Sequence, residues 1–157
     1  MRGTNRGGSK LPGRSVMGHE VQSDGRVHGV VFGCFRREDG RFLMVRRSRH
    51  VPLAGKVCFP GGGMLIGESQ EAACIREARE ELGISITPHK PVWRHEFADR
   101  PITLFGWLAA LEPGPIKPDP LEVEEALWLT RAEALAHPDG LPTNRGFIDA
   151  LEAAMEE

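Results

Sequence analysis

The sequence predicts an α/β protein in which a mixed β-sheet is flanked by helices. Three observations predict this class. Short apolar and β-branched runs are separated by turns that contain Gly, Pro or Asp. The segment 70–82 has the period of an amphipathic helix and lies between these runs. A second apolar helical pattern closes the chain, and strands with helices between and after them are typical of a sheet covered by helices.

The chain divides at residue 26. Residues 1–26 are rich in Gly, Arg and Ser and show no apolar periodicity, so we expect a disordered N-terminal tail. Residues 27–157 are expected to form one domain, because 157 residues in all leave no room for two of ordinary size.

The first elements are expected to be a hairpin and a short strand. Residues 27–35 and 41–46 are apolar runs around an acidic, glycine-containing turn. A polar connection over 48–56 leads to a short strand at 57–59. The cluster 60–63 (PGGG) is expected to be a loop, because consecutive glycines favour neither a strand nor a helix.

The segment 70–82 is the strongest helix prediction in the chain. Ser69 is a suitable N-cap, and Gly83 stands where a helix-terminating glycine belongs. The elements expected after it are strands at 92–97 and 102–111, a loop with four prolines at 112–120, a strand at 123–129, a short helix opened by the Thr130–Glu133 capping box, and a last helix at 144–155.

Composition excludes several functions. Lys and Arg number 20 against 22 Asp and Glu, a formal net charge of -2, which argues against a stable nucleic-acid partner bound through bulk positive charge. No apolar run reaches the ~20 residues of a membrane helix, so no membrane partner is expected. The three cysteines form no CxxC pair, which favours buried thiols and a cytoplasmic location.

The predicted helix carries three carboxylates beside its apolar face. At ~100° per residue, Glu77, Glu80 and Glu81 fall within roughly 100° of arc. Such a trio alone is more typical of a solvated helix face. The glycine cluster just upstream changes this interpretation, because it lets a backbone carbonyl approach a ligand. Carboxylates with a carbonyl are hard oxygen donors that suit Mg²⁺ or Mn²⁺ and, through the ion, a diphosphate.

Residues 62–84 resemble the signature of the Nudix hydrolase family. Gly62 is followed after five residues by Glu68 and after seven more by REAREELGI at 76–84, which matches the family pattern REUxEExGU. The soft departure is Ala78 at an aliphatic position. The resemblance implies an α/β/α sandwich and a hydrolase of phosphoric anhydrides.

The resemblance also implies residue roles. The three helix glutamates match the family's metal ligands, and Glu77 matches the residue that often serves as the base. The carbonyl of Gly61 would be a further ligand. Arg76 and Glu68 resemble the pair that orients the glutamates, although Arg76 could equally form an ordinary i,i+4 pair with Glu80.

Further candidates lie outside the signature. Glu122 is our first choice for a glutamate contributed by a later loop, although acidic loop ends are commonly just solvated. Arg46 and Arg47 form a basic cluster that could meet substrate phosphates, and a solvated cluster is the alternative. Gly62 would let the substrate approach the backbone closely.

The predicted function is metal-dependent hydrolysis of a nucleoside diphosphate linked to another moiety, with nucleotide sugars placed first. Coenzyme A and (d)NTP are the alternative substrates. The mark for coenzyme A is only partial, because Val51 stands where an arginine is expected before Gly55. A non-catalytic nucleotide- or RNA-binding module would predict erosion of the helix glutamates, and none is eroded. The expected partner is a small nucleotide, and the resemblance allows a homodimer.

Overall fold

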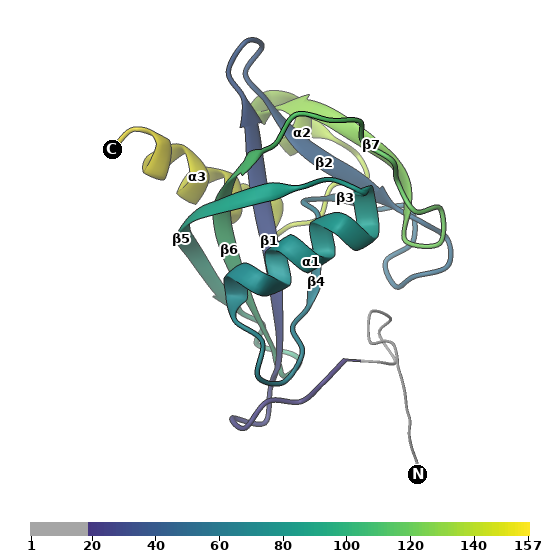
Figure 1. Cartoon of the computed structure of the whole chain (residues 1–157), viewed down its shortest axis with the longest axis vertical. Helices are drawn as coiled ribbons and strands as arrows, with labels where there is room; N and C mark the ends of the chain where they lie inside the picture. Colours follow the sequence, from purple (N-terminus) through teal and green to yellow (C-terminus); the bar gives the residue numbers. More distant parts are fainter. Residues whose placement is uncertain (1–18) are drawn as a thin grey trace.

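The computed structural model describes residues 19–157, which form a mixed sheet between two layers of helices (Figure 1). The strands are β1 (Val27–Arg36), β2 (Arg41–Arg47), β3 (Val57–Cys58), β4 (Gly61–Gly63), β5 (Ile86–Glu96), β6 (Ile102–Leu111) and β7 (Val123–Thr130). The helices are α1 (Gln70–Leu82), α2 (Arg131–Ala136) and α3 (Asn144–Met155).

The sheet contains both parallel and antiparallel pairs, as the sequence predicted. Its main path runs β3-β2-β1-β6-β5, with β4 paired to β1 and β7 paired to β2. The pair β1–β6 is parallel and brings Val27 opposite Ile102, whereas the other strand pairs are antiparallel. Strand β1 is therefore the centre of the sheet and has three neighbours.

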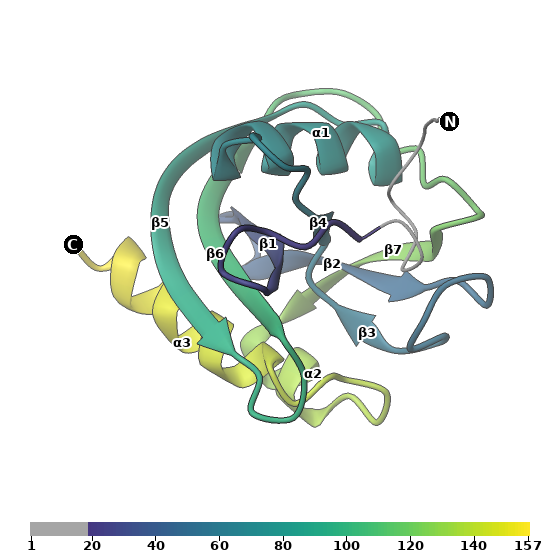
Figure 2. The same cartoon turned by 90° about the horizontal axis from the view of Figure 1, so that it is seen from below.

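Helix α1 lies on one face of the sheet, and α2 and α3 lie on the other (Figure 2). One apolar cluster packs the inner face of α1, including Cys74, Ala78 and Leu82, against the sheet. A second cluster packs Phe147 and Ile148 of α3 against apolar residues of the sheet, including Phe42 and Met44. All three cysteines are buried and unpaired, as expected. The α/β/α sandwich is thus confirmed.

The helix ends follow their local sequence signals. The Ser69 hydroxyl accepts a hydrogen bond from the Ala72 amide at 3.1 Å, and α1 ends at Gly83 in the left-handed conformation, with φ of 63°. Thr130 and Glu133 form the predicted capping box of α2. These contacts explain why the predicted bounds of α1 match the observed ones.

The glycine cluster is not a loop, which corrects the prediction. Gly61–Gly63 is the short strand β4, which pairs with β1 so that Val30 lies opposite Gly62. A side chain would not fit here. A Cβ on Gly62 would lie 2.4 Å from the Glu77 carboxyl carbon, and one on Gly61 would lie 1.9 Å from the Val30 carbonyl oxygen. The glycines therefore serve close packing rather than chain reversal.

Strand β5 is longer than predicted. It begins at Ile86, six residues before the expected start, and includes Pro88 and Pro91. The pairing with β6 shifts near both prolines, and β5 is the edge strand of the sheet. An edge strand tolerates proline because one side of its backbone needs no partner.

Part of the segment predicted to be a disordered tail lies against the domain. Val21 forms an antiparallel bridge with Val27, and the Arg26 side chain donates to the Thr103 hydroxyl at 2.7 Å. The tail prediction for residues 1–18 falls outside the described residues. Among residues 19–157, no helix is both long enough and apolar enough to cross a membrane.

Candidate active site

Helix α1 places its three carboxylates in different environments. Glu77 and Glu81 lie one turn apart, with only 2% and 7% of their surface exposed. The Glu80 side chain is 44% exposed. Two carboxylates are therefore held inside the protein, and the third stands at the rim.

Strand β4 lies directly against the buried pair. The Gly61 amide donates a hydrogen bond to Glu81 Oε1 at 3.1 Å. The Glu77 carboxylate occupies the space where Gly62 would carry a side chain. Gly62, predicted as a substrate contact, thus packs directly against the Glu77 carboxylate.

Arg76 joins the site to the start of α1. Its guanidinium donates to both oxygens of Glu68, at 2.7 and 2.9 Å, and to the Gly63 carbonyl at 2.8 Å. It also contacts Glu77 at 3.0 Å and Glu80 at 3.2 Å. The pairing of Arg76 with Glu68 and its i,i+4 pairing with Glu80 therefore coexist, and one planar fork fixes several carboxylates.

The buried carboxylates lack enough positive charge. Burial raises the pKa of Glu77 to about 7, with Arg76 opposing the rise. Burial and the nearby Glu77 carboxylate raise the pKa of Glu81 well above its ordinary value, and the Gly61 hydrogen bond only partly offsets this. In contrast, although burial raises the pKa of Glu68, hydrogen bonds from Arg76 outweigh it and lower that pKa overall. Ionised Glu77 and Glu81 therefore need a further cation.

The donor set fits a divalent cation that keeps much of its water. Buried carboxylates beside a backbone strand are hard oxygen donors. Within residues 19–157, no three acidic, histidine or cysteine side chains lie together in a cage that could hold a metal ion by themselves. Mg²⁺ does not require such a cage, because it usually takes one or two carboxylates and completes its shell with water and substrate phosphate oxygens.

The structure brings Glu122 toward the same carboxylates. Glu122 is half-buried just before β7, and its charge contributes to the raised pKa values of Glu77 and Glu81. Glu124 and Glu125 are exposed. Among the three glutamates of this segment, Glu122 is the one whose charge acts on the buried pair.

The two arginines at the end of β2, Arg46 and Arg47, have different surroundings. Arg46 forms ion pairs with Glu125 at 3.0 Å and Asp139 at 2.9 Å. Arg47 follows it in the strand and donates a hydrogen bond to the Pro52 carbonyl at 2.6 Å, and its charge lowers the pKa of Glu81. Successive residues in a strand point to opposite faces. The structure therefore associates Arg47, and not Arg46, with the buried carboxylates.

Two residues near the site were not predicted. The His19 ring lies close to Gly63, with its Cδ2 atom 3.2 Å from where a Cβ would stand. Burial lowers the pKa of His19, and the Arg47 charge lowers it further. Glu20 accepts a hydrogen bond from the Ile66 amide at 2.7 Å. No sequence signal marks them, because the segment lacks periodicity.

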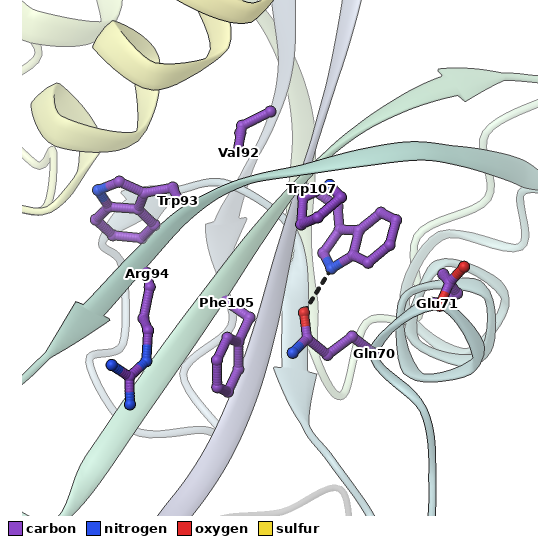
Figure 3. A pocket seen from close by; sticks show the side chains of 8 residues that line it. Gln70, Glu71, Val92, Trp93, Arg94, Phe105 and Trp107 are labelled. Atoms are coloured by element: carbon purple, nitrogen blue, oxygen red, sulfur yellow. Dashed lines mark hydrogen bonds between the residues drawn. The ribbon is translucent and has the colours of Figure 1, made fainter.

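A separate pocket lies beside the first turn of α1 (Figure 3). It has a volume of about 520 Å³ and is bordered by the rings of Phe105 and Trp107 and by Arg94. The Trp107 indole donates to the Gln70 side-chain oxygen at 2.8 Å, which fixes one wall. Gln70 precedes Glu77 by two helical turns, about 10 Å along the axis.

The buried carboxylates predict an unusual pH dependence of stability. A group whose pKa is raised on folding stabilises the protein below its unfolded pKa, here 4.5, and that stability is lost as the pH rises through about 7. We expect Glu77→Gln to gain up to about 3 kcal/mol of unfolding free energy relative to the metal-free native protein between pH 4.5 and 8. Urea unfolding with a chelator measures it.

Adding Mg²⁺ is the control for this prediction. A bound cation favours the ionised carboxylates, so it should shrink the advantage of the variant at pH 8. With chelator present, the same stability difference between Glu77→Gln and the native protein at pH 4.5 and at pH 8 would contradict the assignment of Glu77 as the titrating group.

Comparisons with known proteins agree with the sequence signature. Residues 27–151 match the family described as the NUDIX domain. The chain is 34% identical over 127 residues to an 8-oxo-dGTP diphosphatase of Escherichia coli, covering 78% of this chain and 95% of that protein. It is 35% identical over 129 residues to a CTP pyrophosphohydrolase of the same organism, covering 79% and 93%.

A solved structure shares the arrangement of elements. The crystal structure of a MutT NUDIX hydrolase from Burkholderia pseudomallei superposes with a TM-score of 0.70 at 26% identity. The match covers 80% of this chain and 98% of that one. The fold is therefore shared over nearly all of that protein's length.

Proposed function

The chain belongs to the Nudix hydrolase family, and on that premise we propose that it hydrolyses a nucleoside triphosphate to the monophosphate and pyrophosphate. The observation that carries the reaction type is the pair of buried carboxylates, Glu77 and Glu81, held against a glycine strand and only partly balanced by the Arg76 guanidinium, which contacts Glu77. Such a pair is suited to a divalent cation that contacts a polyphosphate.

The choice of substrate rests on the relatives. Two of them act by name on 8-oxo-dGTP and on CTP, which are nucleoside triphosphates, and this chain covers more than nine-tenths of each. This supports (d)NTP, an alternative in the sequence analysis, over the nucleotide sugar placed first there. Nucleotide sugars and coenzyme A remain the competing substrates in the test below.

The roles that we propose follow from position. A bound Mg²⁺ or Mn²⁺ supplies positive charge to the phosphates and lowers the pKa of a coordinated water. The candidate ligands are Glu77, Glu80, Glu81, the Gly61 carbonyl and Glu122, of which one ion would take one or two carboxylates and complete its shell with water and phosphate oxygens.

Glu77 accepts the proton from the attacking water in this proposal. Its carboxylate is held by Arg76 against Gly62, and a bound cation would keep it ionised and able to accept a proton. The water oxygen forms a bond to one phosphorus, the bond to the bridging oxygen breaks, and pyrophosphate leaves. Arg76 holds Glu68, Glu77 and Glu80 in place, and we give it a positioning role.

The adjacent arginines form a matched pair for testing phosphate contacts. Arg47→Ala should raise KM about tenfold, because a charge-assisted contact to phosphate is worth about 1.4 kcal/mol. Arg46→Ala should leave KM within about twofold, since Arg46 is held by Glu125 and Asp139. Steady-state kinetics measure both variants, and equal KM values would contradict our placement of Arg47.

A substrate panel tests the function. Purified protein is incubated with 8-oxo-dGTP, CTP, a nucleotide sugar and coenzyme A, each with Mg²⁺ and with a chelator. Magnesium-dependent release of monophosphate and pyrophosphate from a triphosphate is the expected result. Preference for the nucleotide sugar or coenzyme A would overturn the substrate class. No metal-dependent product from any of the four would favour the non-catalytic binding module.

A further inference from the structure

The described N-terminal segment, residues 19–26, contacts both the metal-binding side of the molecule and the start of β6. Residues 64–69 join β4 to α1 and are called the β4–α1 connection. We propose that Glu20 is a positioning residue that holds this connection in place. By holding it, Glu20 also fixes the position of the proposed metal ligands. His19 supports the same contact. The inference rests on the proposed function for its effect on catalysis, but not for its effect on the protein itself.

One end of the segment holds the β4–α1 connection. The Glu20 carboxylate accepts the Ile66 amide hydrogen bond at 2.7 Å, and Ile66 itself is 65% exposed. An exposed residue of this kind has little packing to fix it. The half-buried His19 ring covers Gly63 just before the connection begins. Met64 is buried in the core, so these contacts restrain the more exposed part of the connection that follows it.

The other end of the segment is anchored to the sheet. The Arg26 guanidinium donates to the Thr103 hydroxyl and to the Ile102 carbonyl, both at 2.7 Å. Thr103 is completely buried, so this anchor is protected from water. Asp24 also accepts from the His28 ring at 2.8 Å within β1. The segment therefore links the β4–α1 connection to the start of β6 (Figure 1).

The β4–α1 connection carries groups that set the site geometry. Glu68 at its end is the main partner of Arg76, and Arg76 in turn contacts Glu77 and the Gly63 carbonyl. A shift of this connection moves Glu68, and Arg76 transmits the shift to the carboxylates. Displacements near 1 Å cost catalysts up to about 100-fold in rate.

Ordering of the β4–α1 connection and binding of the cation should stabilise each other. If ordering of the β4–α1 connection favours the cation, then cation binding must favour ordering of the connection by the same factor. This reciprocity gives a readout that does not require turnover. Hydrogen–deuterium exchange of the Ile66 amide reports directly on the Glu20 contact.

The experiment compares Glu20→Ala with Glu20→Gln in the full chain. Glutamine keeps an oxygen acceptor for the Ile66 amide, whereas alanine removes it. Exchange of a peptide covering residues 64–69 should be about fivefold faster in Glu20→Ala and close to native in Glu20→Gln. Glu156→Ala, at an exposed position after α3, is the matched control and should exchange at the native rate.

The magnesium response completes the test. Mg²⁺ should slow exchange of the 64–69 peptide in the native protein, and Glu20→Ala should need about fivefold more Mg²⁺ for the same effect. In turnover, Glu20→Ala should lower kcat about fivefold to tenfold with little change in KM, and Glu20→Gln should restore it.

Two results would overturn the inference. One is native exchange at residues 64–69 in Glu20→Ala, which would mean that Glu20 does not hold the connection. The other is faster exchange with an unchanged magnesium response, which would leave the contact without influence on the site. A native protein that hydrolyses none of the panel substrates would instead count against the proposed function, because the exchange measurements stand without activity.

Discussion

Glu81→Gln is expected to lower kcat by about 10³-fold while leaving the protein folded. Removing one anionic ligand of a catalytic cation forfeits several kcal/mol of transition-state stabilisation, and each 1.36 kcal/mol is a factor of ten. Folding should survive because the amide oxygen can still accept from the Gly61 amide. Glu80→Gln is expected to act in the same direction. Single-turnover kinetics with saturating substrate measure the chemical step.

The matched control for Glu81→Gln is Glu124→Gln. Glu124 is exposed near the start of β7 and is outside the proposed ligand set, so its variant should retain native kcat. Circular dichroism and urea unfolding should show that both variants fold. Hydrolysis at the native rate in Glu81→Gln would remove the basis of the proposed metal site.

Gly62→Ala should also lower activity strongly, for a steric reason. A Cβ at this position would lie 2.4 Å from the Glu77 carboxyl carbon and 2.5 Å from one of its oxygens, closer than real Cβ contacts. The backbone of β4 is held by its pairing with β1, so the Glu77 carboxylate must move instead. We expect kcat to fall about 100-fold, because the proposed base is displaced by about 1 Å or more.

Gly40→Ala provides the control for simple destabilisation. Gly40 lies in the β1–β2 turn with a φ of 70° and no other atom near its would-be Cβ. Alanine there is strained by about 1 kcal/mol but touches nothing in the site. It should lower the midpoint of urea unfolding and keep native kcat. Full activity in Gly62→Ala would mean that Glu77 tolerates another position.

The parts of the fold encoded by local signals were predicted closely. Helix α1 has the predicted bounds because Ser69 and Gly83 determine its ends within the segment itself. Strand β4 was missed because its glycines are required by the approach of α1, and a sequence pattern does not show that approach. Strand β5 was shortened in the prediction because Pro88 and Pro91 are tolerated only at a sheet edge, which depends on the topology.

The site residues also fall into those that local spacing predicts and those that depend on the tertiary structure. The spacing of the glutamates along one helix is enough to place Glu77 and Glu81 together, and the structure adds that both are buried. The different surroundings of Arg46 and Arg47 depend on which face of β2 meets α1, which the sequence does not specify. Glu20 was missed because its contact with Ile66 joins segments 46 residues apart.

The central position of β1 has a consequence for when activity first arises during synthesis. The strand β4 that supports the carboxylates pairs with β1. The parallel neighbour of β1 is β6, which is complete only when residue 111 has been synthesised. Loop closure over this distance makes parallel pairing a slow, late step of folding. A nascent chain that ends within β5 would contain the complete signature sequence and still lack the frame that aligns it.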